Sequence, residues 1–133
     1  MNLFRLCKIV LFCGLFLVSI CHAQEAPLSI SEMRIEPATA APGQVMLISC
    51  RVVHAKGPMF IERVAATVLQ TENHASYPML FDDGTHGDRV ARDGVYSLQI
   101  KAPEVPGEGR IVFEALAVDK VEIESPPTPF AVK

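Results

Sequence analysis

The sequence predicts an all-β domain behind an N-terminal export signal, and two observations lead to the β class. Prolines and glycines, which number 10 and 8 in the chain, cut the sequence after residue 23 into short runs bounded by turn residues. Within most of these runs apolar and polar residues alternate, and none has the length and 3.6-residue period of an amphipathic helix. We therefore expect strands that each bury one face.

The first 23 residues have the three parts of a secretion signal. Arg5 and Lys8 give a positive start, residues 9–20 form an almost wholly apolar run, and residues 21–23 end in the small Ala23 that a signal peptidase reads. We expect cleavage after Ala23. The apolar run is shorter than the roughly 20 residues that a bilayer requires, and no second run follows it, so we expect no membrane span after cleavage.

Removal of the signal leaves residues 24–133, the length of one ordinary domain, which we expect in the periplasm or outside the cell. This part carries 10 basic and 15 acidic side chains, a net charge of −5. An acidic balance without a clustered basic patch argues against nucleic-acid binding. The alternative to cleavage after Ala23 is lipidation of Cys21, although the bulky Ile20 before it is unusual in a lipoprotein signal.

The first three expected strands are separated by turns that contain proline or glycine. The strand Leu28–Glu36 ends at Pro37, a turn with Pro42-Gly43 follows, and a second turn at residues 56–58 precedes the third strand. The second and third strands are Val45–Ala55 and Phe60–Gln70. In both strands the residues that should face the core recur with a period of two: Met46, Ile48, Cys50, Val52, Val64, Ala66 and Val68.

Four further strands are expected after a polar loop at residues 71–76. They are Tyr77–Phe81, Val95–Lys101, Arg110–Asp119 and a short run at Phe130–Val132. An aspartate-rich turn separates the first two, a loop with prolines at residues 102–109 follows, and a proline cluster at residues 126–129 precedes the last. The expected core faces of the fifth and sixth strands are Tyr96, Leu98, Ile100, Ile111, Phe113, Ala115 and Ala117.

Seven short strands in about 110 residues predict an immunoglobulin-like sandwich of two sheets. Packing two sheets together is the stable solution, because a single open sheet of these strands would expose its apolar face to water. Cys50 is the only cysteine after the signal, so no internal disulfide can form. We expect Cys50 to be buried as a small apolar residue, and an intermolecular disulfide is the alternative.

The turn before the fifth strand gathers four carboxylates that could bind calcium: Asp82, Asp83, Asp88 and Asp93. Aligned with the 12-residue calcium loop of EF-hands, however, the turn has Gly84 and His86 where oxygen ligands are needed. The alternative requires no metal, because aspartates accept hydrogen bonds from backbone N–H groups two residues on, and glycines adopt positive φ without strain. Two self-contained turns would then close successive strand ends.

A resemblance to a known class of module rests on the same turn. Residues 82–96 read D-D-G-x-x-G-D-x-x-x-x-D-G-x-Y, with Pro42-Gly43-Gln44 before the second strand and Ala117-Val118-Asp119 at the end of the sixth. These features resemble the immunoglobulin-like and fibronectin-like modules of secreted bacterial proteins, including the choice-of-anchor X type. The resemblance implies a β-sandwich that works at the cell surface or envelope, and it implies no reaction.

The chain lacks the common sequence motifs of catalysis. His54, His74 and His86 do not have the spacing of zinc ligands, and no H-E-x-x-H, C-x-x-C or G-x-S-x-G pattern occurs after the signal. Cys50 is expected to face the core, where a thiolate is disfavoured. A catalytic acid pair of the glycosidase type is recognised by the distance in space between two carboxyl groups, which the sequence does not give. We expect that the protein is not an enzyme.

The sixth strand carries a second apolar face, which suggests a surface for a partner. In the expected sandwich this strand lies beside the third, and an exposed apolar patch of several hundred Å² usually marks an interaction site. The alternative is that these residues suit the middle of a sheet, or that the loop around Pro126 covers them. The candidate partner-binding residues are Leu69, Val112, Leu116 and Val118.

Together these features favour an exported, non-enzymatic binding or assembly module of the bacterial envelope. Its partner would be a protein, bound at the outer sheet face or at a strand edge, and a homodimer is one form of such contact. The alternative is a calcium-stabilised adhesion or carbohydrate-binding module that uses the loop from Asp82 to Asp93. Carbohydrate sites usually use exposed aromatic platforms, and the chain has no Trp and only two Tyr. We expect no cofactor, and calcium is the alternative.

Overall fold

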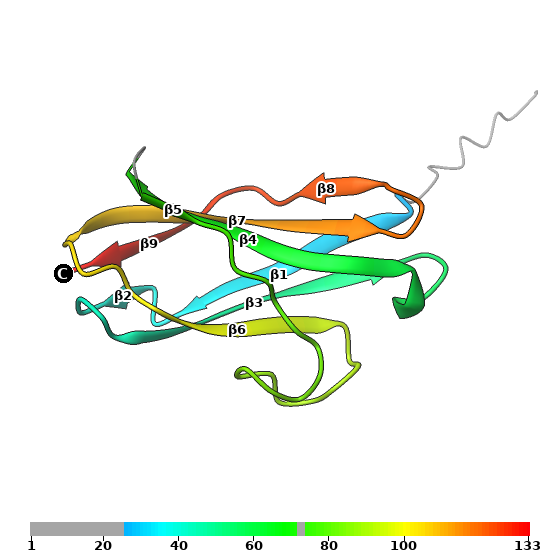
Figure 1. Cartoon of the computed structure of the whole chain (residues 1–133), viewed down its shortest axis with the longest axis horizontal. Coiled ribbons are helices and arrows are strands. Elements are labelled where there is room, and N and C mark those ends of the chain that lie inside the picture. The colour runs from blue at the N-terminus through cyan, green and yellow to red at the C-terminus, as the bar shows by residue number, and fades with distance from the viewer. Residues whose placement is uncertain (1–25, 72–73) are drawn as a thin grey trace, which may run out of the picture.

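The computed structural model describes residues 26–71 and 74–133, which form two β sheets packed face to face (Figure 1). The helical structure within these ranges is one 3-10 turn, Pro58–Phe60. The predicted all-β two-sheet sandwich is therefore confirmed. The predicted signal, its cleavage site and Cys21 lie outside the described residues. Within the described part of the chain, no helix has the length and apolar character needed to cross a membrane.

The smaller sheet contains three antiparallel strands in the order β1-β3-β6, namely Leu28–Glu36, Val45–His54 and Val95–Lys101. The larger sheet has the order β2-β9-β7-β4-β5, and β8 pairs with the edge of β7 that β9 also uses. The strands of the larger sheet are β2 (Thr39–Ala40), β4 (Ile61–Thr71), β5 (His74–Ser76), β7 (Gly107–Ala117), β8 (Glu122–Glu124) and β9 (Thr128–Val132). As predicted, the sixth expected strand, now β7, lies beside the third, now β4.

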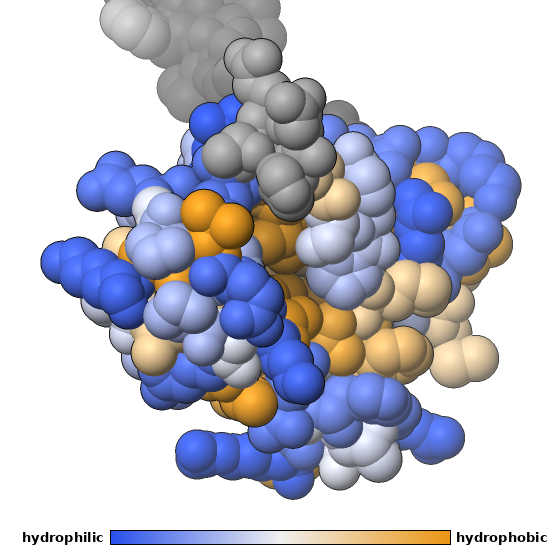
Figure 2. Space-filling view, turned by 60° about the vertical axis from the view of Figure 1, so that its left-hand side comes forward, coloured by the Kyte–Doolittle hydropathy of each residue, from blue (hydrophilic) through white to orange (hydrophobic). Residues whose placement is uncertain are grey.

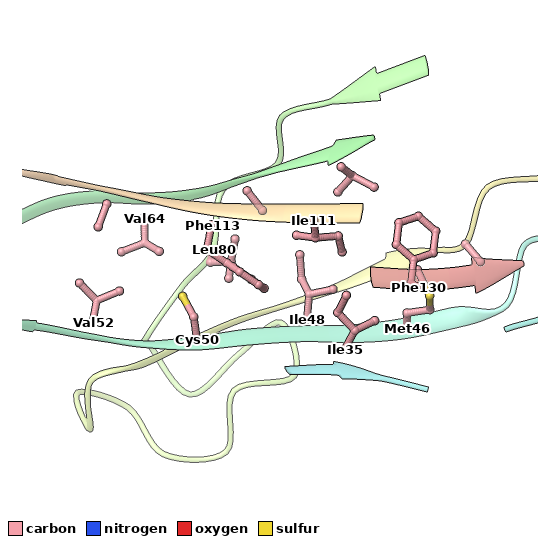
Figure 3. Packing of buried hydrophobic residues seen from close by; sticks show 14 of the residues in the cluster. Ile35, Met46, Ile48, Cys50, Val52, Val64, Leu80, Ile111, Phe113 and Phe130 are labelled. Atoms are coloured by element: carbon pink, nitrogen blue, oxygen red, sulfur yellow. The ribbon is translucent and has the colours of Figure 1, made fainter. Parts of the chain in front are cut away.

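Alternate residues of the two sheets fill the space between them (Figure 3). Ile48 and Cys50 of β3 point from one layer toward Ile111 and Phe113 of β7 in the other, and all four are 0% exposed. Phe113 is the largest fully buried side chain. The core residues predicted for the second, third and sixth strands are all buried: Met46, Ile48, Cys50, Val52, Val64, Ala66, Val68, Ile111, Phe113, Ala115 and Ala117.

The expected strand Tyr77–Phe81 is instead an extended segment that crosses from one sheet to the other (Figure 1). Met79 forms a single bridge with Ala65 of β4, and two residues later Phe81 forms a single bridge with Ser97 of β6. Leu80, between them, is 3% exposed and belongs to the core. The predicted alternation holds, but the hydrogen bonds go to two different sheets. We call residues 77–81 the crossing segment.

Some shorter elements also differ from the expectation. β5 occupies part of the expected polar loop, and β7 begins at Gly107, inside the expected loop at residues 102–109. Gly109 helps this early start, because a Cβ at that position would lie 2.3 Å from the Phe130 ring. β2 and β8 have no counterpart among the expected strands, since two or three residues are too few for a periodic pattern.

Candidate functional site

Asp82 closes the loop that joins the crossing segment to β6. Its two carboxylate oxygens accept the backbone N–H groups of Asp93 at 3.1 Å and Gly94 at 2.9 Å. The N–H of Arg92 donates to the Asp82 carbonyl at 3.2 Å. Gly94 has a φ of 86°, where a side chain would be strained. One carboxylate therefore ties together residues 12 apart in the sequence.

Asp88 is the buried centre of this loop, with 7% of its surface exposed. Its carboxylate accepts the N–H groups of Gly84 at 2.8 Å and Val90 at 3.4 Å. The exposed Asp93 accepts the N–H of Val95 at 2.9 Å. The bonds from Val90 and Val95, each two residues after its aspartate, are those that the interpretation as self-contained turns predicts, whereas the bond from Gly84 spans four residues.

Asp83 has a separate set of partners. One of its oxygens accepts both the hydroxyl of Thr85 at 2.5 Å and the N–H of Thr85 at 2.9 Å. These hydrogen bonds, that of the hydroxyl first, hold the pKa of Asp83 below its ordinary value. The ring of His86 stacks on Phe81, with 4.3 Å between the centroids. Asp83 therefore belongs to the tight turn at residues 83–86.

The structure brings together three of the four predicted metal ligands. Carboxylate oxygens of Asp82, Asp88 and Asp93 lie within 4.8 Å of one another, and Asp83 is not in this group. Burial raises the pKa of Asp82, and the negative charge of Asp88 raises it further, although backbone hydrogen bonds act in the opposite direction. The oxygens have lone pairs beyond those used by the backbone donors. The group could therefore coordinate a hard divalent cation.

The four predicted partner-binding residues lie on the outer side of the larger sheet or just past its end. Val118, beyond β7, is 52% exposed, and the other three are half-buried: Leu69, Val112 and Leu116. The hydroxyl of Thr67 donates to the Glu114 carboxylate at 2.7 Å, between the positions of Val112 and Leu116. This polar pair divides the predicted patch into two smaller apolar areas.

A groove of about 400 Å³ lies on the side of the sandwich between β5 and β6. Val68 and Ile100 are core-facing residues at its floor, and Val105 beside them is 61% exposed. Figure 2 brings this side of the molecule forward and shows hydrophobic residues in a hollow between hydrophilic rims. The lining residues are Val68, Gln70, Ala75, Ser76, Ile100, Lys101, Pro103, Glu104 and Val105.

Sequence reasoning did not find this groove. Its lining comes from two stretches of the chain, residues 68–76 and 100–105, and only the packing of the two sheets brings them together. One signal was present, namely an isolated valine between Pro103 and Pro106 in a loop that otherwise reads as polar. The side-chain amide of Gln70 donates to the Val105 carbonyl and holds this loop against the end of β4.

Of the described histidines, His86 stacks on Phe81 and His54 is buried. His54 is 4% exposed, its Nδ1 accepts the N–H of Lys56 at 3.0 Å, and its ring stacks on Phe60 with 5.3 Å between the centroids. His54 Nε2 lies 4.0 Å from the Asp119 carboxylate and has no hydrogen-bond partner among the described residues. The predicted burial of Cys50 is confirmed, and this burial raises the pKa of its thiol to about 12, so a thiolate is strongly disfavoured.

Comparison with protein-family models and with curated proteins gives no match. Among solved structures, the cycloalternan-degrading enzyme from Trueperella pyogenes is similar to this chain, with 21% sequence identity and a TM-score of 0.48. The similarity covers 73% of this chain and 15% of that chain, so the protein spans a small part of the enzyme's length. Similarity at this level bears on neither the activity nor the ligands of the protein.

Proposed function

We propose that the protein is an exported, non-enzymatic binding or assembly module of the bacterial envelope, which acts through contact with another protein. The observation that carries this proposal is the apolar groove between β5 and β6. There the buried Val68 and the half-buried Ile100 line a concave surface beside Val105, which is 61% exposed. Concave and mainly apolar surfaces are the usual form of binding sites, and exposed apolar surface of this kind usually marks an interaction.

Two further features support a protein partner. Tyr77 and Met79, in the crossing segment that follows β5, are 72% and 48% exposed, and the pairing of Met79 with the outward-facing Ala65 puts these large side chains on the outer side of the larger sheet. Tyrosine and methionine are enriched at protein interfaces. The secretion signal predicted in the first 23 residues would bring such a module to the envelope, in agreement with the resemblance to secreted bacterial modules.

Capture of a partner from an envelope extract tests this proposal. We expect the immobilised protein to retain a specific envelope protein, identified after chemical cross-linking. The variants Val105→Asp and Leu116→Asp probe the groove and the outer sheet face separately, and circular dichroism checks that each variant is folded. The proposal fails if both folded variants retain the same proteins in the same amounts as the wild type.

The second candidate is a calcium-stabilised adhesion module, and the observation that favours it is the convergence of three carboxylates in the loop before β6. A cation bound there would link the crossing segment to the start of β6 and so stabilise the native state. Melting the protein with calcium and with a chelator tests this candidate, because a ligand that binds only the folded chain raises the melting temperature.

A further inference from the structure

Both strands that border the groove are edge strands. β6 pairs with β3 on one side and, on the other, forms a single bridge from Ser97 to Phe81. β5 pairs only with β4 among the described strands. Exposed strand edges present unpaired N–H and C=O groups that can pair with another chain, and proteins usually cover or blunt them. The crossing segment covers β6 at Phe81 and leaves the stretch after it open.

The hydrogen bonds of Ser97 show which way the free backbone groups of β6 point. Its N–H donates to the Phe81 carbonyl at 2.9 Å, and its carbonyl accepts the Phe81 N–H at 3.1 Å. Because successive residues direct these groups to opposite sides of a strand, the N–H and C=O of Gln99 and Lys101 also point away from β3. They have no hydrogen-bond partner among the described residues.

The floor of the groove suits the side chains of a strand added at this edge. Ile100 lies between Gln99 and Lys101 and faces the core, with Val68 of β4 opposite it across the groove. A strand paired with β6 would direct every second side chain to the same side as Ile100, and so into the groove. Apolar side chains suit these positions, because the floor they meet is made by Val68 and Ile100, with Val105 beside it.

The charge at the rim further restricts the added strand. Lys101 is exposed, and its ammonium forms no ion pair with any described residue. The exposed Glu104 also lines the groove, with its carboxylate beside Gly43. On an added strand, a residue that points away from the groove would lie opposite Lys101 on the outer face of the smaller sheet. Opposite charges at directly facing positions stabilise strand pairs. An acidic residue is therefore favoured at that position.

We propose that the groove is a strand-addition site. An extended segment of the partner protein, with apolar residues at alternate positions and an acid opposite Lys101, pairs with residues 99–101 of β6 and fills the space above Val68. Main-chain hydrogen bonds would supply affinity, and the groove would supply selectivity for alternating apolar side chains. This inference rests on the proposed function and names the chemical class of its partner.

The probe that tests this site is a fluorescein-labelled peptide of seven residues that alternates valine with threonine and has one central glutamate. The control peptide has serine in place of each valine. We expect saturable binding of the first peptide by fluorescence anisotropy, and slower amide exchange at Gln99 and Lys101 when it is bound. The site is overturned if the first peptide does not bind at about 1 mM, or if these two amides exchange at an unchanged rate.

Two pairs of variants distinguish strand pairing from nonspecific binding of apolar peptides. Gln99→Pro removes an N–H that points away from β3, and Gln99→Thr retains it. Val105→Asp places a charge in the groove, and Val53→Asp places one on a similarly exposed valine of β3, outside every candidate site. We expect Gln99→Pro and Val105→Asp to weaken binding by about tenfold or more, and their controls to stay within about twofold. Equal effects within either pair overturn the site.

Two further outcomes are informative. Protection of Gln99 and Lys101 that appears without peptide and increases with protein concentration would overturn the inference, because a second copy of the chain would then occupy the groove. If the peptide fails but Leu116→Asp abolishes capture of the envelope partner, the strand-addition site is wrong while the proposed function holds. If neither Val105→Asp in the groove nor Leu116→Asp on the outer face changes capture of the envelope partner, the proposed function fails as well.

Discussion

Replacing Asp82 with alanine should destabilise the domain by about 2 kcal/mol. The change removes the acceptor of two backbone hydrogen bonds, from Asp93 at 3.1 Å and Gly94 at 2.9 Å. Hydrogen bonds to charged groups contribute about 1.5–3 kcal/mol each. The net loss is smaller than the sum of the two hydrogen-bond contributions for two reasons. Water can reach the half-buried loop and replace the lost acceptor. The ionised Asp82 carboxylate is also partly desolvated in the fold, as its raised pKa indicates, and the change removes this cost.

The assay is urea unfolding of Asp82→Ala beside Asp83→Ala, a neighbouring aspartate whose carboxylate accepts hydrogen bonds from Thr85 and lies 3.8 Å from His86 Nδ1 in an exposed turn. We expect the midpoint for Asp82→Ala to fall with little change in slope, and Asp83→Ala to stay within about 0.5 kcal/mol of the wild type. A loss below about 0.5 kcal/mol for Asp82→Ala would refute the view that its carboxylate closes the loop. Equal losses in the two variants would refute it as well.

Three further predictions follow from the same structure. Thr85→Ala should raise the pKa of Asp83 toward its ordinary value of 3.8, which a carbon-detected NMR titration measures. Because folding lowers this pKa, the stabilisation from the Thr85 bonds is complete above the unfolded pKa and is lost as the pH falls through the folded pKa. An unchanged pKa in the variant would show that the Thr85 hydroxyl does not lower the pKa of Asp83. Phe113→Ala should cost about 3–5 kcal/mol in urea unfolding, since Phe113 is 0% exposed, and a loss below about 1.5 kcal/mol would show that it is not central to the core. If calcium binds the three carboxylates, calcium at ten times its Kd should add about 1.4 kcal/mol of stability, and Asp88→Asn should abolish this gain; no shift in melting temperature at millimolar calcium removes that candidate.

The sequence pattern was sufficient for the sandwich and most of its core because burial imposes a period of two on each long strand. Met46, Ile48 and Phe113, for example, are inside as their spacing predicts. The crossing segment shows the limit of the pattern. Residues 77–81 alternate as a strand does, but the partners of Met79 and Phe81 lie in different sheets, and periodicity carries no information about partners.

The candidate sites were predictable only in part for the same reason. Sequence proximity gave Asp82 and Asp83 equal weight as metal ligands, yet Asp83 bonds to Thr85 and stands apart from the carboxylate group. The groove could not be read from the chain, because Val68 and Val105 meet only after both sheets have formed. Local hydrogen bonds and strand faces follow from short stretches of sequence, whereas concave surfaces depend on packing between distant segments.

Site-specific photocross-linking in living cells tests most directly whether the groove contacts a partner. A photoreactive amino acid would replace Val105 in the groove or, as a control, Val90 in the aspartate-rich loop, two valines with 61% and 56% exposure. We predict that illumination links the protein to one envelope protein from position 105 and not from position 90. Adducts from position 90 alone, or from neither position in folded and exported protein, would contradict a binding role for the groove.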